Sequence, residues 1–192
     1  MGGVAAMAKA AGHRVTGCDA NVYPPMSTQL NNLGIDIVEG FDPGQLDIGP
    51  YYVVVGNAMT RGNPVVEEML DRRLPYCSGP QWLSEHVLHN RHVLAVAGTH
   101  GKTTTSSMLA WILEYAGLKP GFLIGGLTRN FDSSARLGES PFFVIEADEY
   151  DRSFLELAPL LAVITNVEPE HLDCYGDAGA LEDAFVTFGD RA

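Results

Sequence analysis

The sequence has 192 residues, of which 46% are hydrophobic and 19% are charged. This composition suffices for one large domain or two small ones and excludes a disordered or fibrous chain. Lys and Arg number 12 against 24 Asp and Glu, giving a formal charge of -12. The acidic balance argues against a nucleic-acid partner, because a phosphate backbone needs a basic face, whereas a nucleotide needs only a local anion pocket.

The three cysteines, Cys18, Cys77 and Cys174, are too far apart in sequence to form a metal knuckle or a redox pair. They indicate reduced thiols and a cytoplasmic protein. No apolar run reaches the length of a membrane span, and the N-terminus lacks a basic region followed by an apolar core. We therefore expect neither a membrane segment nor a signal peptide.

Helix and strand signals alternate along the whole chain, with a seam near Asn90. In the first half we predict helix 2–11, strand 13–18, helix 26–33, strands 35–38 and 51–55, helix 64–72, strand 75–78 and helix 81–88. In the second half we predict strand 92–97, helix 101–116, strands 122–124, 142–145 and 161–165, and helix 180–188. This alternation predicts an α/β fold with parallel sheets, in which ligands bind at the carboxyl ends of the strands.

The most specific motif is a glycine-rich turn that follows an apolar strand and leads through Lys-Thr into a helix. Glycines let backbone N–H groups turn toward phosphate oxygens, and the helix N-terminus adds partial positive charge. Lys102 can reach the outer phosphates, and the Thr103 hydroxyl can ligate Mg²⁺. The general P-loop pattern would place a glycine where Val96 stands, so this loop is a shorter variant. The expected nucleotide contacts are Gly98, Thr99, His100, Gly101, Lys102, Thr103 and Thr104.

Two further motifs follow the ends of apolar strands. Glu146 begins a Glu-Ala-Asp-Glu run after one strand and is our candidate Mg²⁺ ligand, because hard cations take oxygen ligands. Asn166 and His171 follow another strand. We expect Asn166 to be a further nucleotide contact, and the His171 imidazole can ligate a second metal or contact a phosphate. The alternatives are a solvated acidic turn, a surface histidine, and a glycine turn that happens to carry Lys-Thr.

These three motifs, at residues 98–105, 146–151 and 165–173, resemble the central domain of the Mur ligases, in the branch that uses UDP-N-acetylmuramate. Residues 19–28, 56–64 and 78–83 are similar to members that attach a recycled murein tripeptide. From 151 to 188 the sequence looks more like members that add L-alanine. Glu170 stands where the family usually has Asp.

The resemblance implies a Rossmann-like UDP-sugar-binding domain at 1–90, lacking its first strand, and an ATP-binding P-loop-type α/β domain at 91–192. It implies an ATP- and Mg²⁺-dependent amide ligase joining UDP-N-acetylmuramate to L-alanyl-γ-D-glutamyl-meso-diaminopimelate through an acyl phosphate, with L-alanine as the alternative acceptor. Lys102, Glu146 and His171 would be catalytic, and Thr103, Glu146 and His171 would hold metal. The expected UDP-sugar contacts are Asp19, Asn57, Thr60, Arg61 and Asn63, although each is also a turn former.

Two other interpretations remain open. The first is a different P-loop enzyme, such as a small kinase or ATPase. In such an enzyme the sequence segments at 19–28, 56–64 and 78–83 would have no role. A non-catalytic nucleotide-binding fragment is the second, because the family's opening strand and third domain are not found in this sequence. We therefore expect the chain alone to bind ATP without ligating.

Overall fold

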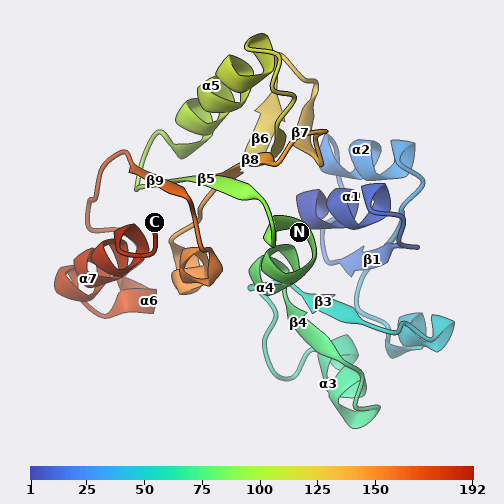
Figure 1. The fold of residues 1–192 in the computed structure, drawn as a ribbon. Coiled ribbons are helices and arrows are strands. Elements are labelled where there is room, and N and C mark those ends of the chain that lie inside the picture. The colour runs from blue at the N-terminus through green and yellow to red at the C-terminus, as the bar shows by residue number, and fades with distance from the viewer. The chain divides into compact units, whose positions relative to one another are not determined.

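The computed structural model describes residues 1–192, apart from the side chain of Asp151. The chain divides into two compact units, Met1–Trp82 and Leu83–Ala192, and each is described by itself. Both alternate helices with mainly parallel strands, as the ribbon of Figure 1 shows, and this confirms the predicted α/β class. The assignment of 1–90 and 91–192 as functional domains stays a prediction.

The first unit contains four short strands in two separate parallel pairs, β1 with β2 and β3 with β4. Its elements are α1 (Gly2–Ala10), β1 (Thr16–Asp19), α2 (Met26–Asn32), β2 (Asp36–Glu39), the 3-10 helix η1 (Pro43–Ile48), β3 (Val53–Val55), α3 (Pro64–Asp71) and β4 (Tyr76–Ser78). Helix α4 (Gly79–Leu83) carries the chain into the second unit. The helix predicted at 81–88 is thus divided between α4 and the π-helical turn η2 (Ser84–Leu88).

Helix α3 begins where its sequence provides both a cap and a suitable first residue. The Asn63 side chain accepts hydrogen bonds from the backbone N–H groups of Val65 and Val66 at 3.0 and 3.4 Å. Pro64 follows at the first helical position, where its missing N–H costs nothing. Val65 and Met69 then pack with Leu46 of η1 in the core of this unit.

The second unit is built on a five-stranded sheet with the order β7-β6-β8-β5-β9. Its elements are β5 (His92–Ala97), α5 (Lys102–Tyr115), β6 (Gly121–Thr128), β7 (Ser133–Arg136), β8 (Phe142–Glu146), the 3-10 helix η3 (Tyr150–Glu156), β9 (Leu161–Ile164), α6 (Leu172–Tyr175) and α7 (Ala178–Gly189). The four strands that we predicted in this half pair parallel, whereas β7, which we did not predict as a strand, pairs antiparallel with β6. Its sequence, Ser-Ser-Ala-Arg, lacks the apolar run that marks the other strands.

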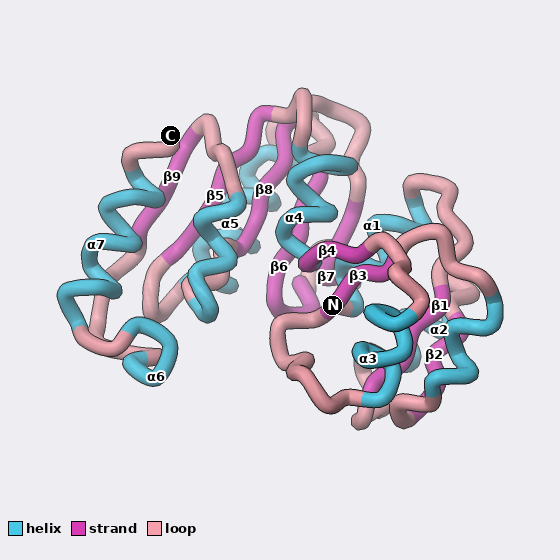
Figure 2. The backbone as a smooth tube through the Cα atoms, turned by 90° about the horizontal axis from the view of Figure 1, so that it is seen from below, coloured by secondary structure: helices cyan, strands magenta, loops and turns pink.

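Strand β5 lies inside the sheet, which explains its apolar sequence. It is hydrogen-bonded to β8 on one edge and to β9 on the other, and all its residues after His92 are buried. A strand that is covered in this way needs apolar side chains on both faces. Helix α5 packs on β5, β6 and β8, and α7 packs on β9; these elements are labelled in Figure 2. Helix α7 also packs on η3. Within α7, Phe188 stacks on Phe154 of η3.

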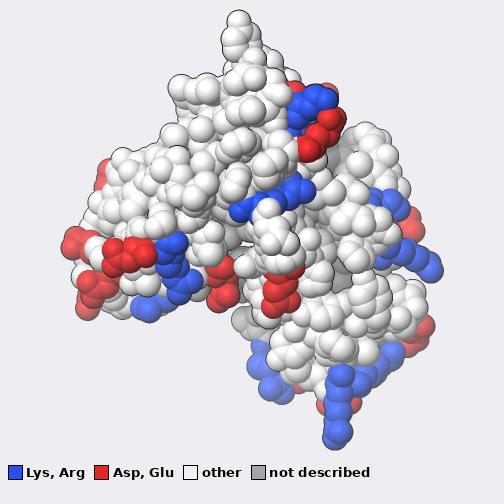
Figure 3. All heavy atoms as spheres, viewed as in Figure 1, with Lys and Arg blue, Asp and Glu red and all other residues white. Residues whose placement is uncertain are grey.

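Among the described residues, no helix is both long and apolar enough to cross a membrane. On the face drawn in Figure 3, basic side chains lie beside acidic ones. This face of the described residues therefore presents mixed charge rather than one broad basic surface.

The cap of α3 leads to the first prediction. We expect Asn63→Ala to lower the free energy of unfolding of the first unit by about 1 kcal/mol, because two backbone N–H groups lose their acceptor. Asn63→Ser, which keeps a capping oxygen, should remain near wild type. Urea unfolding followed by Trp82 fluorescence in a Trp111→Phe background reports on this unit, since Trp82 belongs to it and Trp111 does not. Equal stability of all three proteins would refute the capping role.

Candidate nucleotide-binding site

The sheet of the second unit brings the three sequence motifs together. Strand β5 pairs in register with β8 and β9, so that Val96 lies opposite Glu146 and Ala97 opposite Ile164. The ladder continues beyond the strands, since the Thr165 N–H donates to the Ala97 carbonyl at 3.0 Å. The loops that follow these three parallel strands must therefore meet at one edge of the sheet, as the sequence predicted.

Gly98 is the point of closest approach between the phosphate loop and the segment after β9. Its φ of +129° lies in a region that L side chains rarely adopt. A Cβ at this position would lie 2.1 Å from Thr165 Oγ1 and 2.9 Å from the Asn166 carbonyl oxygen. Only glycine fits here, because any side chain would push the two segments apart.

A set of hydrogen bonds fastens the loop to the same segment. Asn166 accepts from two loop amides, from Thr99 N through its carbonyl at 3.1 Å and from His100 N through Oδ1 at 2.8 Å. The Glu168 N–H donates to Thr99 Oγ1 at 2.8 Å, and Thr165 Oγ1 donates to the His100 carbonyl at 2.6 Å. Asn166 thus lies at the predicted site and supports the loop. Thr165 and Glu168 were not predicted, and no sequence signal marks which loop they contact.

Lys102 begins α5 and points its ammonium group back across the loop. Nζ donates to the Gly98 carbonyl at 2.7 Å and lies 3.3 Å from the Thr99 carbonyl. It also contacts both carboxylate oxygens of Glu149, at 3.0 and 2.9 Å. The Glu149 side chain is only 2% exposed, so this ion pair is poorly screened by solvent. Glu149 was not among the predicted site residues and stands three residues beyond the predicted ligand Glu146.

Thr103 and Glu146 form a second contact at the start of α5. Thr103 Oγ1 donates to Glu146 Oε1 at 2.8 Å, and Gly125 N donates to Glu146 Oε2 at 2.7 Å. Two oxygens bound side by side to one Mg²⁺ at ~2.1 Å lie roughly 3 Å apart. The distance between Thr103 Oγ1 and Glu146 Oε1 is therefore close to that between two neighbouring ligands of one Mg²⁺, the role predicted for both residues. Thr104 lies exposed on the same first turn.

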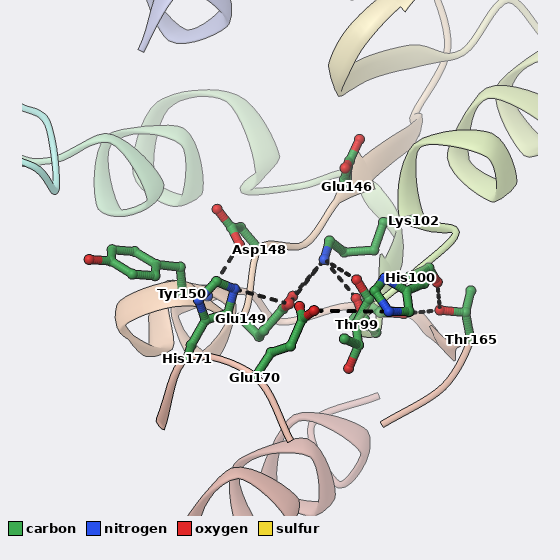
Figure 4. A network of polar contacts seen from close by, with 12 residues as sticks. Thr99, His100, Lys102, Glu146, Asp148, Glu149, Tyr150, Thr165, Glu170 and His171 are labelled. Carbon is green, nitrogen blue, oxygen red and sulfur yellow. Dashed lines mark hydrogen bonds and ion pairs between the residues drawn. The ribbon is translucent and has the colours of Figure 1, made fainter. Parts of the chain in front are cut away.

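His171 belongs to a different group of ligands. The nitrogen and oxygen atoms that His171, Glu149 and Glu170 can offer to a metal all lie within 4.8 Å of one another. His171 Nε2 is 3.8 Å from Glu149 Oε1, and its ring meets Tyr150 edge-on. Figure 4 shows the Glu146 carboxylate pointing away from this cluster. The structure thus joins Thr103 to Glu146 and places His171 with Glu149.

His100 lies at the exposed side of the loop. Its Nε2 is 3.6 Å from Glu168 and 3.9 Å from Glu170. The backbone of His100 is hydrogen-bonded to Asn166 and Thr165 and so helps to fix the loop. Its side chain points toward carboxylates, of which Glu170 is labelled in Figure 4. A phosphate contact by the imidazole stays a prediction.

The predicted UDP-sugar contacts all lie in the first unit. Asp19 ends β1 and accepts from the Asn21 N–H at 3.0 Å, as a turn former does. Arg61 contacts both carboxylate oxygens of Glu67 at 2.8 and 2.9 Å. Hydrogen bonds from Arg61 and from the Gly62 N–H lower the pKa of Glu67 to about 2. The remaining predicted residues are the α3 cap Asn63 and the exposed Asn57 and Thr60.

Models of two protein-family domains match the chain, one for each unit. Residues 1–91 match the model described as Mur ligase family, catalytic domain, and residues 96–191 match the Mur ligase middle domain. The chain belongs to the Mur ligase family. The resemblance carried by the three motifs is thereby confirmed.

Individual relatives agree with this placement of the Mur ligase chain. It is 55% identical over 192 residues to the UDP-N-acetylmuramate–L-alanyl-γ-D-glutamyl-meso-2,6-diaminoheptandioate ligase of Escherichia coli, covering 96% of this chain and 42% of that protein. The crystal structure of the corresponding Neisseria meningitides ligase superposes with a TM-score of 0.95 at 56% identity, covering 100% of this chain and 64% of that one. The UDP-N-acetylmuramate–L-alanine ligase of Acidobacterium capsulatum is 41% identical, over 100% of this chain and 41% of that protein.

The contact at Gly98 leads to the second prediction. We expect Gly98→Ala to weaken ATP binding by this Mur ligase chain at least about tenfold, since displacing the loop removes charge-assisted contacts of about 1.5–3 kcal/mol each. Gly117→Ala is the matched control, because Gly117 also has a positive φ, of +77°, but has open space where a Cβ would stand. It should lose about 1 kcal/mol of stability and keep its ATP affinity in isothermal titration calorimetry. Equal loss of affinity in both variants would contradict the assignment.

Proposed function

We propose that this chain is the UDP-sugar- and ATP-handling part of a ligase that joins UDP-N-acetylmuramate to L-alanyl-γ-D-glutamyl-meso-diaminopimelate. One observation carries the proposal. A phosphate loop that presents Lys102 and Thr103 beside Glu146 occurs in a chain 55% identical, over 96% of its length, to the E. coli ligase with these substrates in its name. The chain spans 42% of the length of that relative, so ligation is proposed for the whole protein.

The proposed reaction proceeds in two steps. A carboxylate is a poor acylating agent, so the muramic acid carboxylate first attacks the γ-phosphate of ATP, forming an acyl phosphate and releasing ADP. The peptide amine then attacks the acyl carbon, forming the amide and releasing inorganic phosphate. Negative charge builds on the transferring phosphoryl group, so cations and N–H donors must be in place beforehand.

The residues of the second unit supply those groups. Lys102 and the loop amides would contact the phosphates, and Thr103 and Glu146 would hold one Mg²⁺. His171, with Glu149 and Glu170 beside it, would hold a second cation, which fits its imidazole and carboxylate ligands. When bound, these ions neutralise phosphate charge. The protein's own contribution is to hold the ligands at the ends of three hydrogen-bonded strands before ATP arrives.

The first unit would bind the UDP-sugar. We propose that Asp19, Asn57, Thr60, Arg61 and Asn63 line that site. Asp19 ends β1, and the other four follow β3, so all lie after the carboxyl ends of parallel strands.

A ligase that adds L-alanine to the same UDP-sugar is the second candidate. The 41% identity to the Acidobacterium capsulatum enzyme extends over the whole chain.

The Thr103–Glu146 contact leads to a prediction that needs only this chain. We expect Mg²⁺ to strengthen ATP binding, and Glu146→Gln to weaken the Mg²⁺-supported affinity on the order of tenfold, because the amide carries no charge for a hard cation. Affinity in EDTA should change little, since the amide oxygen can still accept from Thr103. Glu156→Gln, at an exposed carboxylate of η3, is the control. A uniform loss with and without Mg²⁺ would show that Glu146 supports the loop rather than the metal.

The acceptor leads to a prediction for the whole protein. With UDP-N-acetylmuramate present, we expect ADP release to depend on the tripeptide and not on L-alanine. Release with L-alanine alone would favour the second candidate. ATP binding without release in either case would leave only a nucleotide-binding module.

A further inference from the structure

The ammonium group of Lys102 has no donor left for a phosphate. A lysine offers three N–H donors. In the structure, Nζ lies within 3.3 Å of three acceptor groups, the carbonyls of Gly98 and Thr99 and the carboxylate of Glu149. A nucleotide phosphate can therefore contact Lys102 only if one of these acceptors gives way.

Glu149 is the acceptor that a phosphate can best replace. The two carbonyls belong to the loop that cradles the phosphates, so they stay beside the lysine when the loop is occupied. The carboxylate comes from the other side, after β8, and carries the negative charge that a phosphate would bring. Both of its oxygens face Nζ, at 3.0 and 2.9 Å, as two phosphate oxygens could.

The surroundings of Glu149 make an exchange feasible. Its backbone carbonyl accepts from the buried Tyr175 hydroxyl at 2.5 Å, which holds the main chain while the side chain turns. A buried carboxylate that loses its cation must find another partner, because unpaired charge in the interior is costly. His171 Nε2 already lies 3.8 Å from Glu149 Oε1, so the His171 imidazole is an alternative partner for the carboxylate (Figure 4).

We infer that Glu149 is a positioning residue whose carboxylate binds the Lys102 ammonium group where a nucleotide phosphate would bind. The carboxylate is displaced when the nucleotide binds. The inference rests on the nucleotide site proposed above and adds to it a competitor within the chain. The opposite possibility is that Glu149 is a permanent anchor that keeps Lys102 directed at the phosphates. The two make opposite predictions for removal of the carboxylate charge.

The experiment measures ATP affinity in EDTA for the 192-residue chain and its Glu149→Gln variant. If Lys102 is released from Glu149 in about a tenth of the wild-type molecules, only that fraction can bind the phosphates. The variant, in which this carboxylate charge is gone, should then bind ATP about tenfold more tightly. Inorganic tripolyphosphate, tested by displacement of a fluorescent ATP analogue, should gain by the same factor. Adenosine should not gain, because it offers Lys102 no phosphate. In a Lys102→Met background, Glu149→Gln should have no effect on ATP affinity.

Each other result overturns the inference. Unchanged or weaker ATP binding by Glu149→Gln would favour the permanent anchor, and equal gains for ATP and adenosine would indicate a loosened site. If Glu149→Gln fails to fold, Glu149→Asp, whose shorter carboxylate reaches Lys102 less well, should bind ATP more tightly than wild type, and a loss would refute the exchange. No binding of ATP by the wild-type chain would instead contradict the nucleotide site itself.

Discussion

Strand β5 is hydrogen-bonded on both edges, to β8 and to β9, and the candidate site depends on this arrangement. Parallel strands in register end at one edge of the sheet, so the residues after β5, β8 and β9 meet, and Thr99 is hydrogen-bonded to Glu168, 69 positions further along the sequence. The close approach at Gly98 then brings the phosphate loop against the segment after β9. Backbone pairing and the close approach at Gly98 thus bring the loops of the site together without contacts from charged side chains.

The polar groups of the site are hydrogen-bonded to one another. Lys102 is joined to Glu149, Glu146 to Thr103, and the loop amide of His100 to Asn166. Among the described residues, no buried side-chain nitrogen or oxygen lacks a hydrogen-bond partner. Binding of a nucleotide is therefore an exchange of partners, in which its affinity reflects the difference between two sets of polar contacts rather than the full strength of the new ones.

The sequence was informative where chemistry follows directly from local pattern. The strand-loop-helix around Lys102 and the acidic run after β8 were recognisable because spacing along the chain determines their position. Glu149 was not, because Glu146 ends that strand and both Asp148 and Glu149 follow it, and only the path of the turn decides which carboxylate faces the lysine. The polar strand β7 was missed for a similar reason, since its hydrogen bonds to β6 rather than its own side chains make it a strand.

Asn63 and Arg61 of the first unit use some of their hydrogen-bonding atoms within the protein, and the remaining ones are those that could contact a substrate. The Oδ1 atom of Asn63 accepts from the first turn of α3, and Nδ2 donates to Met59 Sδ at 3.7 Å, so the second N–H of Nδ2 would be the group that contacts a sugar. Arg61 directs Nε and Nη2 to Glu67, and the pair holds the guanidinium in one orientation. Among the contacts described for this residue, Nη1 has none, and the Arg61 side chain is 78% exposed, so Nη1 would be the group that meets an anion. The ion pair with Glu67 thus leaves one donor group of Arg61 for the proposed substrate contact, and a phosphate there would have to compete with the Glu67 carboxylate for the other two.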